Sequence, residues 1–314
     1  MDIVQLGNTG INVSRLCFGT LTMGPLQCNM SVTKGVELIE RAFSNGVNFL
    51  DTAEIYGTYP YVREALKIKP DCVVCTKSYS YDRDTAEKSF RLAVEGIGRE
   101  YIDIFLLHEQ ESIHTIRGHK GAIDYFLEMK RRGYIGAIGL STHHVACMEG
   151  ALAHPVLEVL FPLINRDGIG IADGTSGEML ERINAAHAQG RGIFAMKPLG
   201  GGHLVEEREK ALEYILSIDS IDAIAMGMQT VAEVDYNCAV ISGKKPSESC
   251  AEETKRRKRR LLIHDWCEGC GRCVASCKNG ALSLVNGKAT VDSSKCALCS
   301  YCARVCPQFC IKVI

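Results

Sequence analysis

The chain has 314 residues, of which 46% are apolar and 23% are charged, so it can bury a sizeable core and is not expected to be disordered. Its 37 acidic and 36 basic residues nearly cancel, and this balance argues against a nucleic-acid or membrane-surface partner. No apolar run approaches the roughly 18 residues that a membrane span needs. The chain opens on MDIVQLGNTG, which has neither the basic nor the apolar region of a signal peptide, so we expect a cytoplasmic protein.

The next part of the chain, up to about residue 230, alternates between short apolar runs and longer amphipathic segments. Residues 3–16 are predicted to form a small hairpin ahead of the first strand. The runs that follow are rich in Val, Ile, Leu and Phe and lack polar alternation, which is typical of strands buried on both faces. The predicted strands are SRLCFG, VNFLD, CVVCTK, IDIFLLH, GAIGLS, VLFPLIN, GIFAMK and AIAMG.

Segments with helical character lie between these strands, and several of them end at glycine. They are VTKGVELIERAFSNG, TAEKSFRLAVEGIG, GAIDYFLEMKRRG, GEMLERINAAHAQG and EEREKALEYILSI. Ser31 and Asp84 are the predicted caps of the first two. A chain that alternates strands and helices in this way folds as a doubly wound sheet or as a (β/α)8 barrel. Eight units in about 240 residues favour the TIM barrel, with the opening hairpin as a plug on its floor.

Residues 246–262 differ in composition from the segments on either side. They open on Pro246 and contain a basic run from Lys255 to Arg260. We interpret them as a charged, solvated linker, and as a helix they would span about 25 Å, enough to climb the barrel wall. A nucleic-acid interpretation is weaker, because no basic patch or interleaved aromatic residues accompany the run. The predicted domains are therefore a barrel at 1–245, the linker at 246–262 and a smaller domain at 263–314.

The smaller domain holds nine of the 16 cysteines. In a cytoplasmic chain this density indicates metal binding or reduced thiols and not a disulfide framework. The spacing C-x2-C-x2-C-x3-C occurs twice, beginning at Cys267 and again at Cys296. Three cysteines of such a run bind one cubane, and the fourth binds the other. Zinc fits less well, because it prefers two C-x2-C pairs.

This spacing predicts two 4Fe–4S clusters and resembles the bacterial two-cluster ferredoxins, so we expect an α+β ferredoxin-like domain. Lys278 departs from that pattern, which usually has proline there, and Cys310 is interpreted as a buried spare thiol. The predicted ligands are Cys267, Cys270, Cys273 and Cys306 for the first cluster, and Cys296, Cys299, Cys302 and Cys277 for the second.

Ionisable residues end three neighbouring strands of the predicted barrel. Asp51, Lys77 and His108 end the second, third and fourth strands, and Tyr56 follows Asp51 in the next loop. The C-terminal ends of barrel strands share one mouth, so we expect these groups to converge. The lysine is expected to lower the pKa of the tyrosine, and the carboxylate to hold the lysine. Each residue alone has a structural interpretation, but their succession favours protonation of a carbonyl, oriented by a neutral histidine, while hydride arrives at its carbon.

Six motifs carry a resemblance to a known family: LGNTGINVSRLCFGT, NFLDTAEIYG, TK at 76–77, IDIFLLH, GAIGLS and GMQTVAEVDYN. They resemble the aldo-keto reductases over about residues 1–240. The resemblance implies a (β/α)8 barrel that binds NAD(H) or NADP(H) without a Rossmann fold. It also implies Tyr56 as general acid, Asp51 and Lys77 as the pair that tunes it, and His108 as the residue that orients the carbonyl. The motif AMKPLGGG and the cysteine-rich tail resemble a subgroup of this family fused to a cluster domain.

Several positions that would face the dinucleotide depart from the family pattern. Thr142 replaces an Asn, Glu158 replaces a Gln, and Met196 replaces an aromatic residue. Glu233 stands where a basic residue often meets the 2′-phosphate, and its carboxylate favours NADH over NADPH. By the resemblance, the cofactor-binding residues are Gly19, Thr20, Ser141, Thr142, Glu158, Met196, Lys197, Gly227, Gln229, Thr230, Glu233 and Asn237.

The sequence therefore predicts an oxidoreductase that interconverts a small-molecule carbonyl and its alcohol, with the clusters as an additional electron route. An electron-transfer protein whose barrel docks a redox protein is the alternative, and clusters that are purely structural are a third interpretation. Clusters pass single electrons whereas nicotinamide takes hydride, and no flavin motif is visible to join the two. We expect the cluster domain over or beside the barrel mouth, and an anaerobic or low-oxygen microbe as the source.

Overall fold

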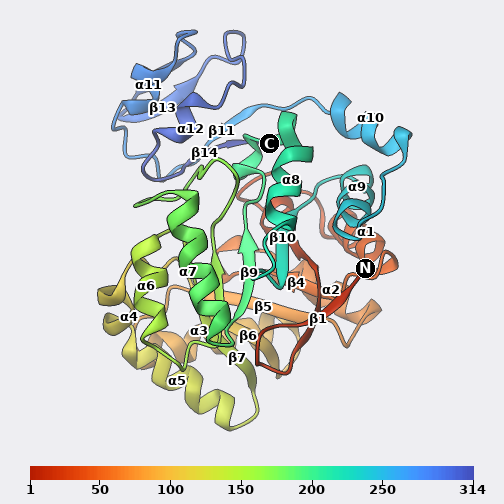
Figure 1. The fold of residues 1–314 in the computed structure, drawn as a ribbon, viewed down its shortest axis with the longest axis vertical. Coiled ribbons are helices and arrows are strands. Elements are labelled where there is room, and N and C mark those ends of the chain that lie inside the picture. The colour runs from red at the N-terminus through yellow and green to blue at the C-terminus, as the bar shows by residue number, and fades with distance from the viewer.

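The computed structural model describes residues 1–314 and has a closed barrel of eight parallel strands ringed by helices (Figure 1). The strands are β3 Leu16–Gly19, β4 Phe49–Asp51, β5 Val73–Ser78, β6 Ile102–Leu107, β7 Ile135–Thr142, β8 Val159–Pro162, β9 Gly192–Met196 and β10 Ala223–Gly227. They pair in chain order, and β10 closes the barrel against β3. Nearly all their side chains are buried, because one face fills the barrel and the other lies under the helices. The predicted TIM barrel is confirmed.

Helices connect the strands around the outside of the barrel. They are α1 Val32–Ser44, α2 Tyr59–Ile68, α3 Arg83–Ile97, α4 Ile113–Gly118, α5 Lys120–Arg131, α6 Val145–Leu152, α7 Ser176–Ala188, α8 Arg208–Leu216 and α9 Val231–Ile241. Short 3-10 turns are η1 Thr20–Met23, η2 Glu54–Tyr56, η3 Gly200–Gly202 and η4 Val205–Glu207. The five predicted helical segments coincide with α1, α3, α5, α7 and α8.

The predicted helix caps are half right. Ser31 caps α1, since its hydroxyl accepts a hydrogen bond from the backbone N–H of Lys34. The cap of α3 is Asp82, whose carboxylate accepts from the N–H of Thr85, and Asp84 lies inside the first turn. The prediction of Asp84 is therefore wrong by one half-turn of chain, because either aspartate can serve as a cap in sequence and only one has the extended backbone of a cap.

A hairpin closes the barrel floor, as the sequence predicts. Its strands are β1 Ile3–Gln5 and β2 Asn12–Ser14. The N–H of Asn8 donates to the carbonyl of Gly190, just before β9, and the N–H of Gly7 donates to Asp222, just before β10. A side chain at Gly7 would clash with the backbone of Gly192 at 2.3 Å, so only glycine allows this close approach.

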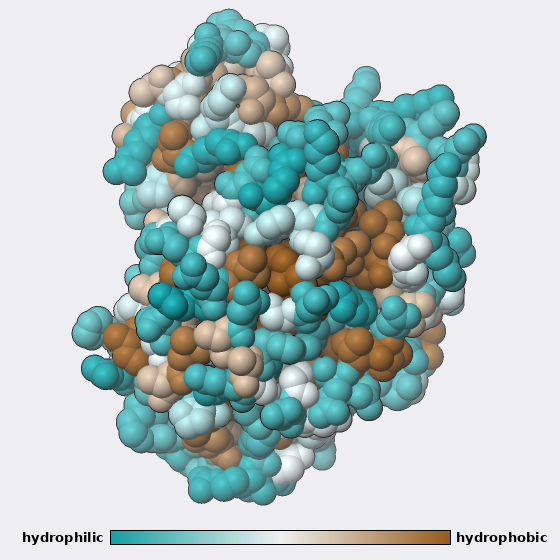
Figure 2. Space-filling view, in the orientation of Figure 1, coloured by the Kyte–Doolittle hydropathy of each residue, from teal (hydrophilic) through white to brown (hydrophobic).

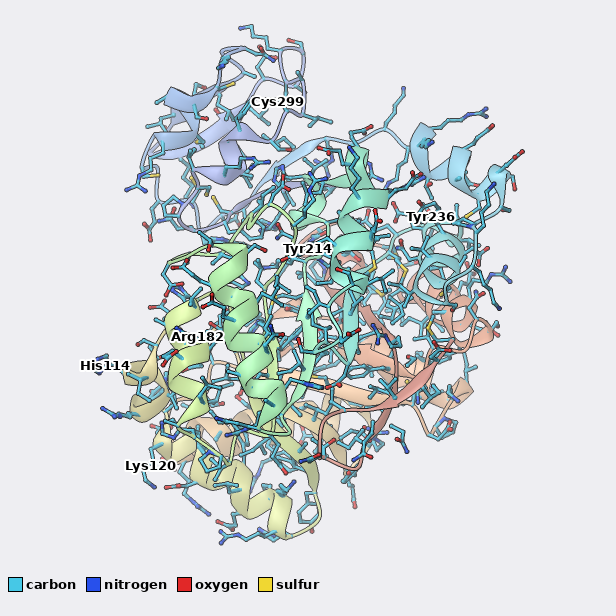
Figure 3. The ribbon with its side chains drawn as sticks, in the orientation of Figure 1. His114, Lys120, Arg182, Tyr214, Tyr236 and Cys299 are labelled. Carbon is cyan, nitrogen blue, oxygen red and sulfur yellow. The ribbon has the colours of Figure 1, made fainter.

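The linker is helical only in its first half. Helix α10 covers Glu248–Arg256 and packs on α9, and the chain then runs without regular structure to β11 Leu261–Ile263. Arg208 fastens this segment: its guanidinium donates to Thr254 and stacks on the ring of Tyr236, which Figure 3 labels on α9. The expectation of a helix across the whole linker is therefore wrong, since residues 257–260 have no regular structure.

The C-terminal module is two short antiparallel pairs with two small helices. Strand β11 pairs with β14 Ile311–Val313, and β12 Leu282–Val285 pairs with β13 Lys288–Val291. Helix α11 is Arg272–Ser276 and α12 is Tyr301–Arg304. The two cysteine loops repeat one backbone form: positive φ angles occur two and four residues after the first cysteine, at Gly269 and Gly271 in one loop and at Leu298 and Ser300 in the other.

The module lies over the C-terminal mouth of the barrel (Figure 1). Ser300 and the carbonyl of Ile311 hold both ring nitrogens of His203, which follows η3. Ala303 and Phe309 pack into the same apolar cluster as the barrel strands. The facing surface in Figure 2 is mostly hydrophilic, with apolar residues gathered in a band across its middle. No helix in the structure has the length and apolar character required to cross a bilayer.

Candidate functional site

The four predicted tetrad residues converge at the mouth. Asp51 is the last residue of β4, Lys77 lies near the end of β5, and His108 directly follows β6. Tyr56 ends the short turn η2, which follows β4. Since these strands are neighbours in the barrel, their ends bring the four side chains together, as the sequence predicts from their order.

Asp51 and Lys77 form a buried ion pair. The Lys77 ammonium donates to Asp51 Oδ1 at 2.5 Å and to the carbonyl of Thr52 at 2.8 Å, and the two side chains are 1% and 6% exposed. Burial raises the pKa of Asp51 above its usual value, and the Lys77 cation opposes that rise. The pair is therefore held in place by its own hydrogen bonds in a site with little water.

Tyr56 is partly buried beside this pair, and the Lys77 ammonium is 5.0 Å from its ring centroid. Burial raises the pKa of Tyr56 well above its usual value, and the charges of Asp51 and Glu109 add to the rise. The expected lowering by Lys77 is thus wrong for this arrangement, because the ammonium points at Asp51 and not at the phenol. A raised pKa keeps Tyr56 protonated at neutral pH, as a proton donor must be.

His108 is a neutral imidazole in a stack of rings. Burial, followed by the charge of Lys77, lowers the pKa of His108 to about 3. Its ring stacks on Tyr79 with centroids 4.6 Å apart and meets the edge of Tyr56 at 5.6 Å. Its Nδ1 is buried without a hydrogen-bond partner. An orphaned polar atom of this kind indicates a place for a ligand group at the mouth.

Of the positions predicted to face the dinucleotide, some are buried within the protein and others keep accessible surface at the mouth. Gly19, Thr20, Ser141 and Thr142 are fully buried, and the three hydroxyls already bond to neighbouring protein groups. Asn237 is buried on α9, and Met196 is nearly so at the end of β9. The others lie in succession at the ends of β9 and β10 and keep accessible surface, so a dinucleotide can reach them there: Lys197, Gly227, Gln229, Thr230 and Glu233.

Glu158 is not at the mouth, so its prediction as a cofactor ligand is wrong. It precedes the first residue of β8 and therefore lies at the barrel floor. Its carboxylate accepts two hydrogen bonds from Lys130, at 2.8 and 2.7 Å. The fully apolar strand after it offered no alternation by which to count the register from sequence.

Glu233 lies at the C-terminal end of the barrel strands, as predicted, but its carboxylate already has partners within the protein. Its carboxylate accepts from Arg257 and from the backbone N–H of Gln229, and Arg259 lies 3.6 Å away. A carboxylate held by two arginines is not free to accept from a ribose hydroxyl, so the structure removes the basis of the predicted NADH preference. The arginines belong to the linker, whose course could not be read from the sequence.

The cysteines predicted for the first cluster line one small cavity. Cys267, Cys270, Cys273 and Cys306 surround it together with Cys310. Four thiols around one cavity fit the ligand set of a cubane, and the N–H of Ala289 points at Cys267 Sγ at 3.4 Å. Cys310 is buried, as expected, with its sulfur 3.4 Å from that of Cys306.

The cysteines predicted for the second cluster lie in the same module. Cys302 is buried and Cys299 is exposed; Figure 3 labels Cys299 in the module, away from the barrel. Cys277 Sγ accepts from the N–H of Ala281 at 3.3 Å. Backbone donors to cluster sulfurs are among the groups that set reduction potential.

Anaerobically prepared protein is expected to contain about eight irons and eight sulfides per chain. Cys302→Ala is expected to remove one cluster and leave about four irons. Cys310→Ala, a matched control, is expected to keep the full iron content because Cys310 is not in either ligand set. Iron and sulfide analysis measures all three, and zinc in place of iron would contradict the assignment.

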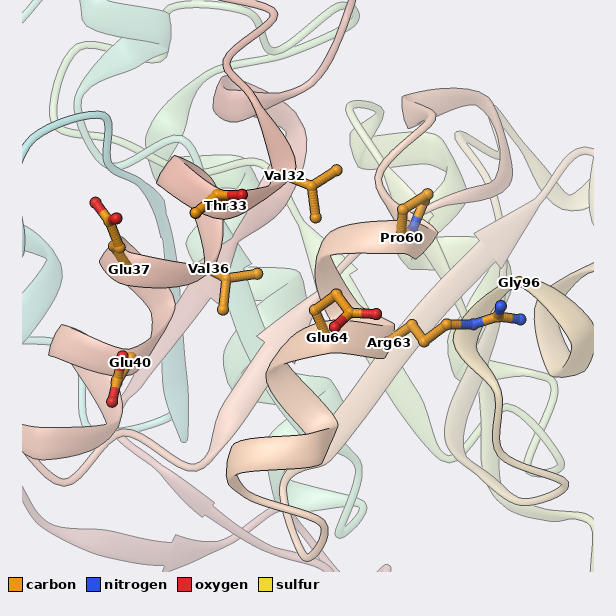
Figure 4. A pocket seen from close by; sticks show the side chains of 9 residues that line it. All are labelled: Val32, Thr33, Val36, Glu37, Glu40, Pro60, Arg63, Glu64 and Gly96. Carbon is orange, nitrogen blue, oxygen red and sulfur yellow. The ribbon is translucent and has the colours of Figure 1, made fainter.

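A separate hollow lies on the outer wall between α1 and α2 (Figure 4). Glu37, Glu40, Glu64 and Arg63 border it. It is lined by the outer faces of helices and by none of the tetrad residues, so it has no part in the chemistry at the mouth.

The sequence interpretation missed a second group of charged residues at the mouth. These are Glu109 after β6, His143 after β7 and Lys312 on β14, with Phe309 between them. Glu109 accepts from the hydroxyl of Tyr79. His143 directly follows β7 and Glu109 comes two residues after the end of β6, which is the signal that could have found them; Lys312 carries no such signal.

Comparisons with known proteins agree with this architecture. The model of the aldo/keto reductase family matches residues 15–215, and that of the 4Fe-4S dicluster domain matches residues 266–310. L-galactose dehydrogenase from Arabidopsis thaliana is 22% identical over 288 residues, covering 77% of this chain and 88% of that protein. The 6-dehydroglucose reductase of Novosphingobium aromaticivorans is 25% identical over 294 residues, covering 83% and 92%. The holo structure of AKR11C1 from Bacillus halodurans superposes with a TM-score of 0.66 at 21% identity, covering 81% and 94%.

Proposed function

Because the chain belongs to the aldo/keto reductase family and ends in a 4Fe-4S dicluster domain, it is an oxidoreductase, and we propose that it interconverts a carbonyl and its alcohol at the tetrad. The observation that carries the proposal is the buried Asp51–Lys77 pair beside Tyr56 and His108 at neighbouring strand ends. We propose the domain division 1–245, 246–262 and 263–314 for the same chain.

Each residue of the tetrad has a distinct part in this proposal. The Tyr56 phenol, kept protonated by its surroundings, gives its proton to the carbonyl oxygen in reduction and takes it back in oxidation. Neutral His108 orients that oxygen, and the Lys77 cation stabilises negative charge that develops on it or on the phenol. Asp51 holds Lys77 in position.

The family implies a nicotinamide dinucleotide, which supplies or accepts the hydride when bound. Gly227, Gln229 and Thr230 are the residues we propose to hold it, since they keep accessible surface along one side of the mouth. Arg257 and Arg259 lie close to these residues and form ion pairs with Glu233.

The test is dinucleotide-dependent turnover of a carbonyl panel by the full chain, followed at 340 nm under anaerobic conditions with NADH and NADPH in parallel. We expect reduction with one of the two dinucleotides. Absence of turnover with either, together with no quenching of dinucleotide fluorescence on binding, would favour the second candidate, an electron-transfer protein whose barrel docks a redox partner. The intact tetrad favours the first candidate.

We also propose that the clusters, which supply one-electron transfer when bound, form an additional electron route. The position of the module supports this proposal. Phe309, three residues after the predicted ligand Cys306, packs into the apolar cluster of the barrel. Rapid-freeze EPR of oxidised protein mixed with NADH or NADPH, with and without substrate, is expected to show reduced clusters. If the clusters stay oxidised in every mixture, the module is a separate or structural device and the route is abandoned.

A further inference from the structure

Two lysines from different parts of the chain lie against one aromatic ring at the barrel mouth. Lys197 follows β9 of the barrel, and its ammonium is 4.8 Å from the ring centroid of Phe309. Lys312 lies on β14 of the C-terminal module, contacts the same ring and donates to the carbonyl of Phe309. Lys312 is only 7% exposed and has no carboxylate partner. Barrel and module therefore each bring one cation to the same ring, a half-buried one from the barrel and a buried one from the module.

Neutral or already engaged groups complete this cluster. The Lys197 ammonium donates to Nε2 of His143 at 2.7 Å, so that nitrogen acts as an acceptor and the imidazole is neutral. Burial and then the Lys197 charge hold the pKa of His143 well below its usual value. Glu109 is the nearby carboxylate, 3.7 Å from His143 Nε2, and it accepts from the Tyr79 hydroxyl. Tyr79 in turn stacks on His108, which joins the cluster to the tetrad.

The backbone is strained at three of these residues. Glu109, Lys197 and Phe309 have φ angles of 47°, 60° and 45°, a region that side-chain-bearing residues rarely adopt. They come from the ends of β6 and β9 and from the tail, yet His143 joins them, since it lies 3.7 Å from Glu109, bonds to Lys197 and meets the edge of the Phe309 ring. Strained positions of this kind persist where the surroundings fix them and are concentrated at ligand sites.

The side chains at the mouth supply fewer carboxylates than cations. Lys77 pairs with Asp51, and Glu109 is the carboxylate that acts on both Lys197 and Lys312. The predicted cluster ligand Cys306 is a further negative group that acts on Lys312. Burial lowers the pKa of Lys197 to about 8 and that of Lys312 well below its usual value. Burial of cations is costly, so an anionic ligand that contacts both ammonium groups is favoured at this place.

We propose that Lys197 and Lys312 together bind the carboxylate of a substrate whose carbonyl lies at Tyr56 and His108. The substrate class is thus an oxo acid, or a hydroxy acid in the reverse direction. This inference rests on the proposed carbonyl chemistry and deepens it. It also gives the module a second use, because it supplies Lys312 to the barrel site.

The experiment compares two aldehydes of the same shape, 4-carboxybenzaldehyde and 4-carbamoylbenzaldehyde, with the full cluster-loaded chain. Wild-type protein is expected to prefer the acid in kcat/KM by roughly tenfold or more, the worth of one charge-assisted hydrogen bond. Lys197→Met and Lys312→Met are each expected to abolish most of that preference. Lys312→Arg keeps the charge and is expected to restore part of it, and Lys210→Met on the exposed face of α8 is the matched control that keeps the preference.

Binding of the same two aldehydes without dinucleotide, measured by ligand-observed NMR, separates the subsite from the reaction. Tighter binding of the acid that depends on both lysines supports the subsite even if no turnover is found, and in that case only the carbonyl reaction fails. Equal binding and equal kcat/KM of acid and amide overturn the inference while leaving the reaction standing. If Lys312→Met instead weakens NADH or NADPH and leaves the acid unaffected, the anion is the dinucleotide's and the inference is overturned.

Discussion

Tyr56→Phe is expected to lower kcat/KM for carbonyl reduction by roughly 10²-fold or more. The change removes the proton that the carbonyl oxygen needs and keeps the ring that meets His108 edge-on. Phenylalanine keeps the ring contacts of Tyr56 with His108 and Lys77, so we expect little change in stability. Steady-state kinetics gives the activity, and dinucleotide fluorescence quenching is expected to show unchanged binding.

Tyr59→Phe is the matched control for that experiment. Tyr59 lies three residues further along at the start of α2, and its hydroxyl bonds to that of Thr76 at 2.9 Å in a buried site. Loss of this bond is expected to cost about 1 kcal/mol in the free energy of unfolding and to leave turnover nearly unchanged. Near-normal reduction by Tyr56→Phe, or equal losses in both variants, would show that Tyr56 is not the proton donor.

Lys77→Met is expected to lower the free energy of unfolding by about 3 kcal/mol or more, and to abolish turnover. The methionine fills the space of the lysine stem but leaves the Asp51 carboxylate buried without its cation. Removing one partner of a buried pair is much more harmful than removing both. Urea unfolding at fixed pH measures the effect, and the double variant Asp51→Asn with Lys77→Met is expected to recover most of the stability and none of the activity.

The loss in free energy of unfolding caused by Lys77→Met is expected to depend on pH. Burial already raises the pKa of Asp51 in the native protein, and loss of the opposing Lys77 charge raises it further. Between the unfolded value of about 3.9 and the raised folded value, the folded chain binds more protons, so its stability falls as pH rises. The gap to wild type is therefore expected to be larger at pH 8 than at pH 5. A gap that is constant across this range would mean that the pKa of Asp51 is not raised into this range in the variant.

Local patterns in the sequence were enough to predict the barrel and the dicluster domain. The strands are short and apolar on both faces because each one is buried between the barrel interior and a helix. Each apolar run in the sequence therefore indicates a buried strand by itself. The cysteine spacing is equally local, since three ligands of a cubane come from a single loop. The tetrad could be predicted because Asp51, Lys77 and His108 stand at successive strand ends, and closing a barrel brings such ends together.

Other features depended on how distant segments meet. Asn237 and Glu158 were assigned by position along the chain, but the fold buries the first on α9 and places the second on the floor. The helices α2, α4 and α6 are short, and their form is set by packing on the barrel. The pKa of Tyr56 rises and does not fall, because the direction of the Lys77 ammonium and the burial of the phenol are both three-dimensional facts.

The position of the C-terminal module on the barrel is the main feature that only the tertiary structure determines. The sequence by itself determined two domains, a carbonyl tetrad and two cysteine sets, since each is encoded within a strand, a strand end or a loop. It could not show that Arg257 bonds to Glu233 or that Lys197 and Lys312 both lie against Phe309, because each of these arrangements joins distant parts of the chain and no periodicity in the sequence reveals it. Only the packing of the module over the barrel mouth brought those charges together, and burial there lowers the pKa of Lys197 and Lys312.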